Sequence, residues 1–274
     1  MNSNTWTIES LPLATTQVPG PEVFWMQDWD RWYDLTIQVF LLTSPAGVVL
    51  INTGPGLLAS MIDQVWSADL GPRGRLIVIG DLKDQLNARG IATSDIDEVI
   101  VTPLQPYTLG GLTGLQPPRV VVSGRGWRHH LDGPHTMHDA PEWDVPRAAA
   151  GLLLEDNARR LVLADDECVL RPGLSASWIG THHRSSLLIE VTTLVGRVAI
   201  TDAVFLQENL RRRRPIGICE NLDEAERAFD LLADFDLVLP IYDPAVAGIQ
   251  VPGPDLTGAF AQELSIRQDL KGER

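Results

Sequence analysis

Histidine is the side chain best suited to acid–base or metal chemistry, and four of the six in this chain lie between positions 124 and 147: His129, His130, His135 and His138. The spacing His135-x-x-His138 is compatible with two ligands of one zinc ion. Their neighbours Asp132, Gly133 and Pro134 indicate an open turn instead. We therefore expect a long loop with exposed histidines, and we keep a relocated metal site as the alternative.

A second group of chemically useful side chains is aromatic. Trp25, Trp29 and Trp32 lie close together in the segment 24–33, and Trp127 lies in the histidine-rich loop. Tryptophan combines a large apolar area with a polar tip, so these rings could form a wall of a binding pocket. The alternative interpretation is a helical turn that packs its aromatic rings on the core, and the sequence favours neither.

Short apolar segments must position these residues. Apolar and β-branched runs between turn residues predict a series of strands, at 35–42, 48–51, 96–102, 119–123, 161–164, 168–170, 174–179, 186–193, 197–201 and 237–241. Apolar spacing predicts helices at 79–88, 148–160, 221–235 and 256–270. In the third of these, Asn221 and Glu224 form a capping-box pattern. Residues 1–20 are expected to form an irregular lead-in, and 124–147 a loop.

Several of these strands end in motifs with a recognisable order. Leu50-Ile-Asn-Thr-Gly-Pro55 is followed by the segment Asp95–Gly111, by Gly180-Thr-His-His-Arg-Ser-Ser-Leu187, by Ala199-Ile-Thr-Asp-Ala203 and by Leu239-Pro-Ile-Tyr-Asp243. From about Phe24 to Pro244 this series resembles the metallo-β-lactamase superfamily. Residues 205–243 look like a branch near the N-acyl-homoserine lactonases. The resemblance implies one α/β domain over residues 1–274, an αββα sandwich of two mixed β-sheets flanked by helices.

The resemblance also shows where this chain departs from the superfamily. The zinc-ligand positions of the histidine motif correspond here to Pro103, Gln105, Tyr107 and Thr108, and the position of the last histidine is Tyr242. Of the usual ligands, only His182 and Asp202 remain, and two ligands do not hold a catalytic zinc ion. We therefore expect no dinuclear zinc centre and no cofactor. A mononuclear zinc site at His182, His183 and Asp202 is the alternative.

Chemistry without a metal remains open to the same positions. If they surround one cleft, as the resemblance implies, Asp202 can orient His182 as a general base. Tyr107, Gln105, Tyr242 and Arg184 could stabilise an oxyanion, and His183 is a further candidate. Ser185 could act as nucleophile only if a histidine reaches it. We expect Trp25, Trp29 or Trp32 to roof this pocket, and the 124–147 loop to border it.

These residues support two hypotheses about function. The first is a hydrolase or lyase that acts on a small ester, lactone or amide through His/Asp/Tyr acid–base chemistry. The second is a catalytically inactive protein of the same fold that binds a small molecule or a protein partner. The residues that remain capable of proton transfer favour the first.

Composition limits the partners of the chain. A net charge of −14 argues against nucleic acid or an anionic membrane as a partner, and Arg211–Arg214 is the one basic run. No apolar run approaches the roughly 20 residues of a membrane span. The first twenty residues lack the pattern of a signal peptide, and Cys168 and Cys219 set no disulfide framework. We expect a cytoplasmic protein with a small-molecule substrate or ligand, and a homodimer stays open.

Overall fold

The computed structural model describes residues 4–132 and 160–253. The helices expected at 148–160 and 256–270 lie outside these residues, apart from position 160, and so do His135 and His138. Within the described part, no helix combines the length and the apolar character needed to cross a membrane.

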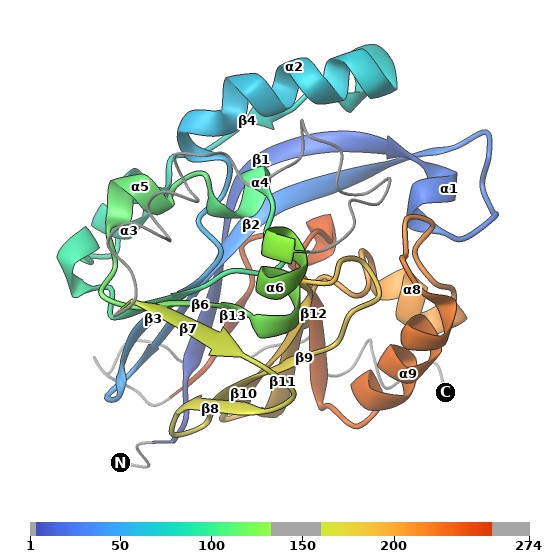
Figure 1. The fold of residues 1–274 in the computed structure, drawn as a ribbon. Coiled ribbons are helices and arrows are strands. Elements are labelled where there is room, and N and C mark those ends of the chain that lie inside the picture. Colours follow the sequence, from blue (N-terminus) through green and yellow to red (C-terminus); the bar gives the residue numbers. More distant parts are fainter. Residues whose placement is uncertain (1–3, 133–159, 254–274) are drawn as a thin grey trace.

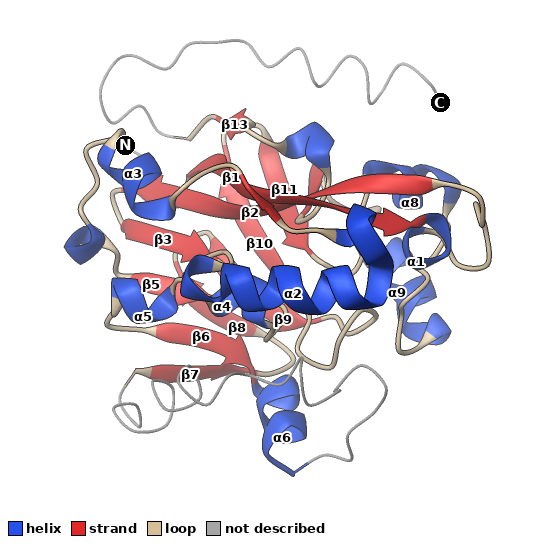
Figure 2. Ribbon diagram, turned by 90° about the horizontal axis from the view of Figure 1, so that it is seen from above, coloured by secondary structure: helices blue, strands red, loops and turns tan. Residues whose placement is uncertain are grey.

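Two mixed β-sheets form the centre of the molecule (Figures 1 and 2). The strands of the first sheet follow the order β13-β1-β2-β3-β5-β6-β7, and β4 pairs with β1. The strands of the second follow the order β12-β11-β10-β9-β8. Neighbours are antiparallel except along β3-β5-β6-β7 and in the pair β11-β12. The first sheet comprises β1 (Thr7–Pro19), β2 (Trp32–Ser44), β3 (Gly47–Ile51), β4 (Ile77–Val78), β5 (Glu98–Ile100), β6 (Val120–Ser123), β7 (Leu161–Ala164) and β13 (Gln250–Val251). The second comprises β8 (Cys168–Arg171), β9 (Leu174–Trp178), β10 (Leu187–Thr193), β11 (Gly196–Thr201) and β12 (Leu237–Pro240).

Alternation along the strands divides the apolar side chains among three cores. In β2, Phe40 and Leu42 belong to the core between the sheets, whereas Val39 and Leu41 belong to a core on the outer face of the first sheet. In β10, Ile189 joins the central core. Its neighbour Leu188 joins a third core on the outer face of the second sheet. Side chains of successive strand residues point to opposite faces, so each sheet is covered on both sides.

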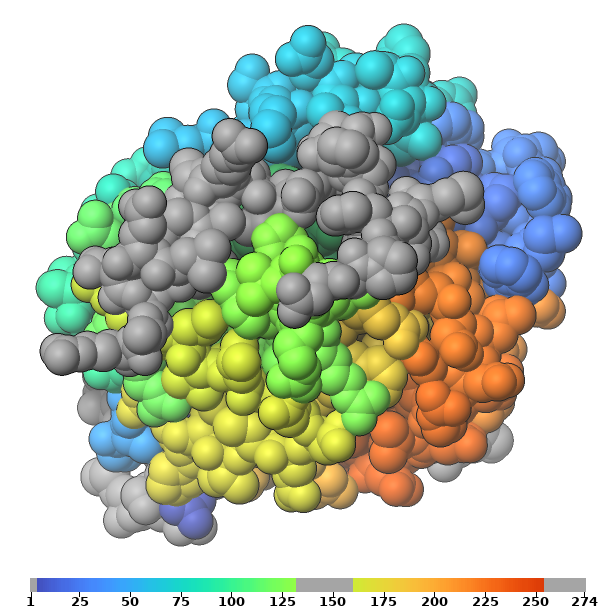
Figure 3. All heavy atoms as spheres, in the orientation of Figure 1, coloured from blue at the N-terminus to red at the C-terminus, as the bar shows by residue number. Residues whose placement is uncertain are grey.

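Helices close the two outer cores and one end of the sandwich. α3 (Leu82–Asn87), α4 (Pro106–Leu109), α5 (Leu112–Leu115) and α6 (Gly124–Asp132) contribute to the core outside the first sheet, and α9 (Leu222–Leu232) to the core outside the second. α2 (Ala59–Leu70) instead packs Ile62 into the central core. It lies along the upper edge of the face in Figure 3, with the segment of α8 (Gln207–Arg212) and α9 at the right. α1 (Gly20–Val23) joins β1 to the segment before β2. The arrangement is the expected αββα sandwich.

The structure corrects two expectations about elements. The expectation of an irregular lead-in at residues 1–20 is wrong. Residues 7–19 form β1, which pairs with β2 along the whole length of β1. A register shift between Pro12 and Ala14 accommodates the proline inside this strand. The segment 124–132 is helical and not a loop, and α2 was not predicted.

Candidate active site

The loop between β9 and β10 and the end of β11 bring His182 and Asp202 together. β10 pairs with both neighbours, so residues 179–186 lie at the same edge of the sheet at which β11 ends. His182 Nδ1 lies 3.1 Å from Asp202 Oδ2, and both side chains are buried. Nε2 of the same ring makes no hydrogen bond with another polar group in the described part of the chain. A proton on Nδ1 thus leaves Nε2 as a hydrogen-bond acceptor and base.

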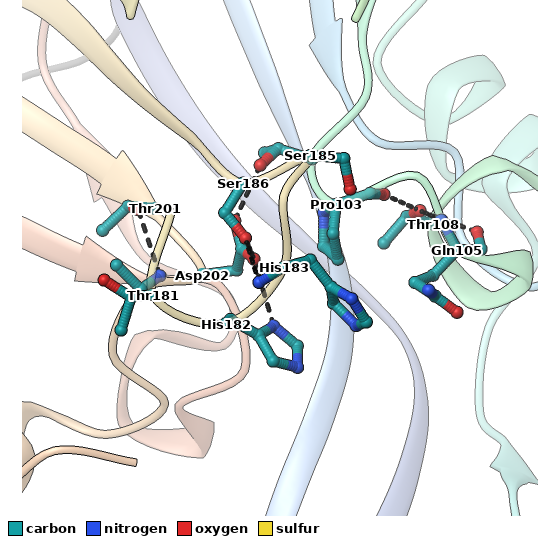
Figure 4. A network of polar contacts seen from close by, with 12 residues as sticks. Pro103, Gln105, Thr108, Thr181, His182, His183, Ser185, Ser186, Thr201 and Asp202 are labelled. Atoms are coloured by element: carbon teal, nitrogen blue, oxygen red, sulfur yellow. Dashed lines mark hydrogen bonds and ion pairs between the residues drawn. The ribbon is translucent and has the colours of Figure 1, made fainter. Parts of the chain in front are cut away.

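Hydroxyl groups hold the Asp202 carboxylate in place. The Ser186 hydroxyl donates to Oδ2 at 2.5 Å, and the Thr102 hydroxyl donates to Oδ1 at 2.7 Å. Thr102 is itself fixed because its backbone exchanges two hydrogen bonds of 2.9 Å with the Asn52 side chain. Thr102 follows β5 of the first sheet and Asp202 follows β11 of the second, so the hydrogen bond between them spans both sheets. Figure 4 shows Asp202 with Ser186 and His182. Every partner of the carboxylate can donate a proton, so the group is arranged to act as an acceptor.

Two phenols stand beside this pair. Tyr107 lies on α4 and Tyr242 follows β12; their ring centroids are 6.1 Å apart, and that of Tyr242 is 6.0 Å from His182. Burial raises the pKa of both phenols well above their usual range, and the charge of Asp202 adds to the effect. Both groups therefore stay protonated and can donate. The buried hydroxyl of Tyr242 interacts with the Tyr107 hydroxyl beside it, and it makes no hydrogen bond of regular geometry within the described residues.

A cavity of about 280 Å³ opens between the sheets at this edge. One part of its lining is polar and includes most of the predicted catalytic residues: Gln105, Tyr107, His182, His183 and Tyr242. The remainder is mainly apolar and aromatic, with a few polar groups: Thr16, Val18, Glu22, Leu35, Ile37, Trp66, Asp69, Leu70, Phe205 and Ile218. A small cavity with an apolar wall and a few convergent polar groups is typical of a site for a small molecule.

His183 lies closer to the site than its position in the chain suggested. Adjacent residues often point apart, yet the His182 and His183 rings extend to the same side of their loop, with centroids 4.4 Å apart (Figure 4). Thr181, with φ 73°, provides the bend in the backbone before them. Both imidazoles thus contribute to one wall of the cavity.

Arg184 does not have the predicted role in oxyanion stabilisation. Its guanidinium forms two hydrogen bonds of 2.9 and 2.8 Å with Glu224 on α9 and a further one with Glu220. Glu224 also accepts a hydrogen bond from the backbone of Thr181. The guanidinium is therefore committed to fixing the histidine loop to α9, and Arg184 does not line the cavity.

The predicted binding residues lie elsewhere. Ser185 accepts a hydrogen bond from the Leu104 backbone, and Trp127 is buried in the core outside the first sheet. Trp29 is 70% exposed, and Arg73 stacks on Trp32. Neither these four residues nor Trp25 lines the cavity, so the predicted tryptophan roof is wrong. The nucleophilic role considered for Ser185 required a histidine within reach. Its hydroxyl instead faces the Leu104 amide.

The apolar, aromatic and acidic part of the lining was not predicted from the sequence, and three of its residues add rings or a carboxyl to the site. Trp66 comes from α2, Glu22 from α1 and Phe205 from the segment after β11. Trp66 packs against Tyr107 at 5.6 Å, and the edge of Phe205 meets His182 at 4.9 Å. The amphipathic pattern of 59–70 was the available signal for Trp66. Nothing in the local sequence distinguishes Glu22 or Phe205.

The residues at this site do not fit a zinc centre. The Thr108 hydroxyl bonds to the backbone of Pro103 and Gln105, so this position serves the loop structure. His182 and Asp202 bond to each other, and both Asp202 oxygens are held by hydroxyl donors. Residues 4–132 and 160–253 contain no group of three or more histidine, cysteine or acidic side chains that could hold a metal ion. A tight site would require three protein ligands.

Comparisons with known proteins identify the fold. No family model and no curated protein matches the sequence. Solved structures do match. A probable metal-dependent hydrolase from Staphylococcus aureus has a TM-score of 0.69 and 14% identity over 89% of this chain and 91% of that one. For a hydrolase of the β-lactamase superfamily, AbOPH, the TM-score is 0.67, with 15% identity over 92% and 96%. AiiA from B. thuringiensis, solved as a variant with N-decanoyl-L-homoserine at its active site, has a TM-score of 0.65 and 15% identity over 87% and 94%. The chain has the metallo-β-lactamase fold, as its motifs predicted.

Proposed function

We propose that this protein is a hydrolase that cleaves a small ester, lactone or amide by general acid–base catalysis, with His182 as the base. The observation that carries the proposal is the hydrogen bond between His182 Nδ1 and Asp202, which leaves Nε2 as the free nitrogen of a ring that lines the cavity. The structural neighbours named above include hydrolases, one of them with an acyl-homoserine bound. The activities given for those neighbours support hydrolysis as the class of reaction.

The chemistry follows from the positions of the donors and acceptors. Nε2 of His182 accepts a proton from water as the water oxygen attacks the carbonyl carbon, and the carbonyl π electrons move to oxygen. Tyr107, Tyr242 and Gln105 supply hydrogen-bond donors for that oxyanion. When the tetrahedral intermediate collapses, the bond to the leaving oxygen or nitrogen breaks. The leaving group then takes the proton from Nε2, which yields a carboxylic acid and an alcohol or amine.

Asp202 has an orienting role in this scheme. Its hydrogen bond selects the tautomer of His182 and stabilises the imidazolium that forms during the attack. The Ser186 and Thr102 hydroxyls keep the carboxylate from turning away. Positioned acid–base catalysis of this kind contributes on the order of 100-fold to 10,000-fold in rate.

A hydrolysis screen tests the proposal. Purified protein, dialysed against a chelator and checked for residual metal, is assayed with aryl esters, lactones and anilides, beside a His182→Ala variant. We expect turnover of at least one class that the chelator leaves unchanged and the substitution removes. Turnover that disappears with the metal contradicts the mechanism. Ligand binding without any turnover supports the non-catalytic alternative instead.

A further inference from the structure

Glu22 is an acidic residue in the cavity with no partner for its charge. It lies on α1 and lines the cavity. Its carboxyl makes no hydrogen bond or ion pair with any residue in the described part of the chain. Burial alone raises the pKa of this carboxyl to about 7, because no donor or cation offsets the loss of water.

The fully buried carboxylates of the described residues all have partners. Arg184 holds Glu224, and Arg119 lies 3.0 Å from Glu98. Asp202 has its own donors, as described above, and Asp243 accepts hydrogen bonds from two backbone amides. Glu22 is half-buried and has neither a cation nor a donor among the described residues, which is costly, so its presence here requires an explanation.

The basic run beside α1 does not supply the missing cation. The Gly217 amide donates to the Glu22 carbonyl, so the segment that follows this run touches α1. Arg211 and Arg212 pair with Glu208, however, and Arg213 pairs with residues of α9. Arg214 forms no ion pair with Glu22 either. The protein leaves the Glu22 carboxyl open toward the cavity.

The rest of the lining suits a positive charge. Neither lysine nor arginine is among the lining residues, whereas Asp69 adds a second carboxyl. Trp66 and Phe205 contribute aromatic rings, whose faces attract cations. The net charge of −14 favours the approach of a cation over that of an anion. At the catalytic end, the Tyr242 hydroxyl lies beside that of Tyr107 without a hydrogen bond of regular geometry in the described residues, so it can donate to a carbonyl oxygen of the substrate.

We propose that the substrate of this cavity is an ester, lactone or amide that carries an ammonium group, which pairs with Glu22 while the carbonyl group lies between His182 and Tyr242. This inference rests on the proposed hydrolase function and adds the class of substrate. Aliphatic or aromatic parts of the substrate contact the apolar wall between the two ends.

Binding of matched probes tests the role of Glu22 separately from turnover. Calorimetry at pH 8 compares choline with its neutral isostere 3,3-dimethylbutan-1-ol, and benzylamine with benzyl alcohol. We expect wild-type protein to bind at least one cation about tenfold or more tightly than its neutral counterpart. Glu22→Gln should remove that preference and leave binding of the neutral probe unchanged, which also shows that the variant is folded.

An exposed carboxylate nearby provides the control. Asp30→Asn removes the same charge from the protein outside the cavity and should keep the preference for the cation. The inference is overturned if neither cation is preferred, or if Glu22→Gln keeps the preference. The proposed function fails by a different result, the absence of turnover that depends on His182, so the two failures are distinguishable.

Discussion

The chemistry at the residue scale depends on which nitrogen of His182 is free. Asp202 accepts from Nδ1, and the hydroxyls of Ser186 and Thr102 fix the carboxylate from two sides. A histidine without this partner would distribute its proton between both nitrogens. The pair therefore presents one base in one orientation to the cavity. The phenols of Tyr107 and Tyr242, protonated because they are buried, provide donors beside it.

Tyr242→Phe should change stability and activity in opposite directions. Removing a buried hydroxyl that makes no hydrogen bond of regular geometry in the described residues should raise the free energy of unfolding by about 1 kcal/mol. Loss of the same donor for the oxyanion should lower kcat on the order of tenfold, less than the loss expected for His182→Ala. Urea unfolding and initial-rate kinetics measure both effects. Tyr33→Phe, which alters a phenol outside the cavity, is the control and should leave kcat unchanged. A Tyr242→Phe variant with full activity would show that the hydroxyl serves no catalytic role.

Glu22→Gln should stabilise the protein at alkaline pH. The folded-state pKa of about 7 exceeds the ordinary value of 4.5, so the contribution of the carboxyl to stability is fully present below pH 4.5. It is lost as the pH rises from 4.5 to about 7. The variant does not lose this stability. The difference in free energy of unfolding between the variant and wild type should therefore grow between pH 5 and pH 8, by at most about 3 kcal/mol. Urea unfolding at both pH values checks it, with Asp30→Asn as control. An equal difference at both pH values contradicts the assignment.

Residue types at matched positions predicted the centre of the site but not its surroundings. His182, His183, Gln105, Tyr107 and Tyr242 line one cavity, as the motifs implied. Arg184 and Ser185 belong to the same motif as the two histidines. The Arg184 side chain nevertheless binds Glu224 of α9, and the Ser185 hydroxyl accepts a hydrogen bond from the Leu104 amide. Glu22 was missed because nothing in its neighbourhood shows that its carboxyl is buried. Such roles depend on partners that only the folded chain provides.

The histidine loop and α9 form one unit at the scale of elements. Glu224 binds both the Arg184 guanidinium and the Thr181 amide, so the helix fixes the loop on both sides of His182 and His183. Trp178 at the end of β9 donates its indole N–H to the Arg184 carbonyl. Contacts to protein groups thereby fix the loop and the orientation of its imidazoles.

Glu224→Gln should loosen this loop. Removing one partner of a buried pair leaves the arginine charge incompletely matched, and we expect a loss of about 3 kcal/mol in the free energy of unfolding. Because the loop carries His182, kcat should fall more than KM rises. Asp223→Asn, on the exposed side of the same helix, is the matched control and should change neither value. Unchanged stability in Glu224→Gln would show that Glu220 alone holds Arg184.

Elements with a strong local pattern were predictable, and elements defined by tertiary contacts were not. The α9 helix has an N-cap at Asn221 and one apolar face, and the hairpin of β10 and β11 lies close to where its apolar runs predicted. β1 was missed, and its regular pairing with β2 is interrupted only by the register shift between Pro12 and Ala14. A tertiary contact also explains Gly110: a Cβ there would lie 1.9 Å from the Pro55 carbonyl oxygen, so packing requires glycine at this position.

The whole molecule places its site where the two sheets meet. Thr102 follows β5 of the first sheet and Asp202 follows β11 of the second, so their hydrogen bond is one of those that join the two halves of the sandwich. α2 spans the same end and adds Trp66 to the cavity wall. The fold was predictable because the order of motifs along the chain resembles that of the superfamily. The cavity was less predictable from the sequence, because α1 and α2 reach it only through the packing of the complete sandwich.

The most direct test of acid–base catalysis by His182 and Asp202 is kcat/KM for His182→Ala, Asp202→Asn and the double variant. It is measured on chelator-treated protein with the best substrate of the screen. We expect each single substitution to lower kcat/KM on the order of 100-fold to 10,000-fold. The double variant should lose little more, because residues that act as a unit are not additive. Urea unfolding of the same proteins separates loss of structure from loss of chemistry. Unchanged turnover in folded His182→Ala would show that His182 is not the catalytic base.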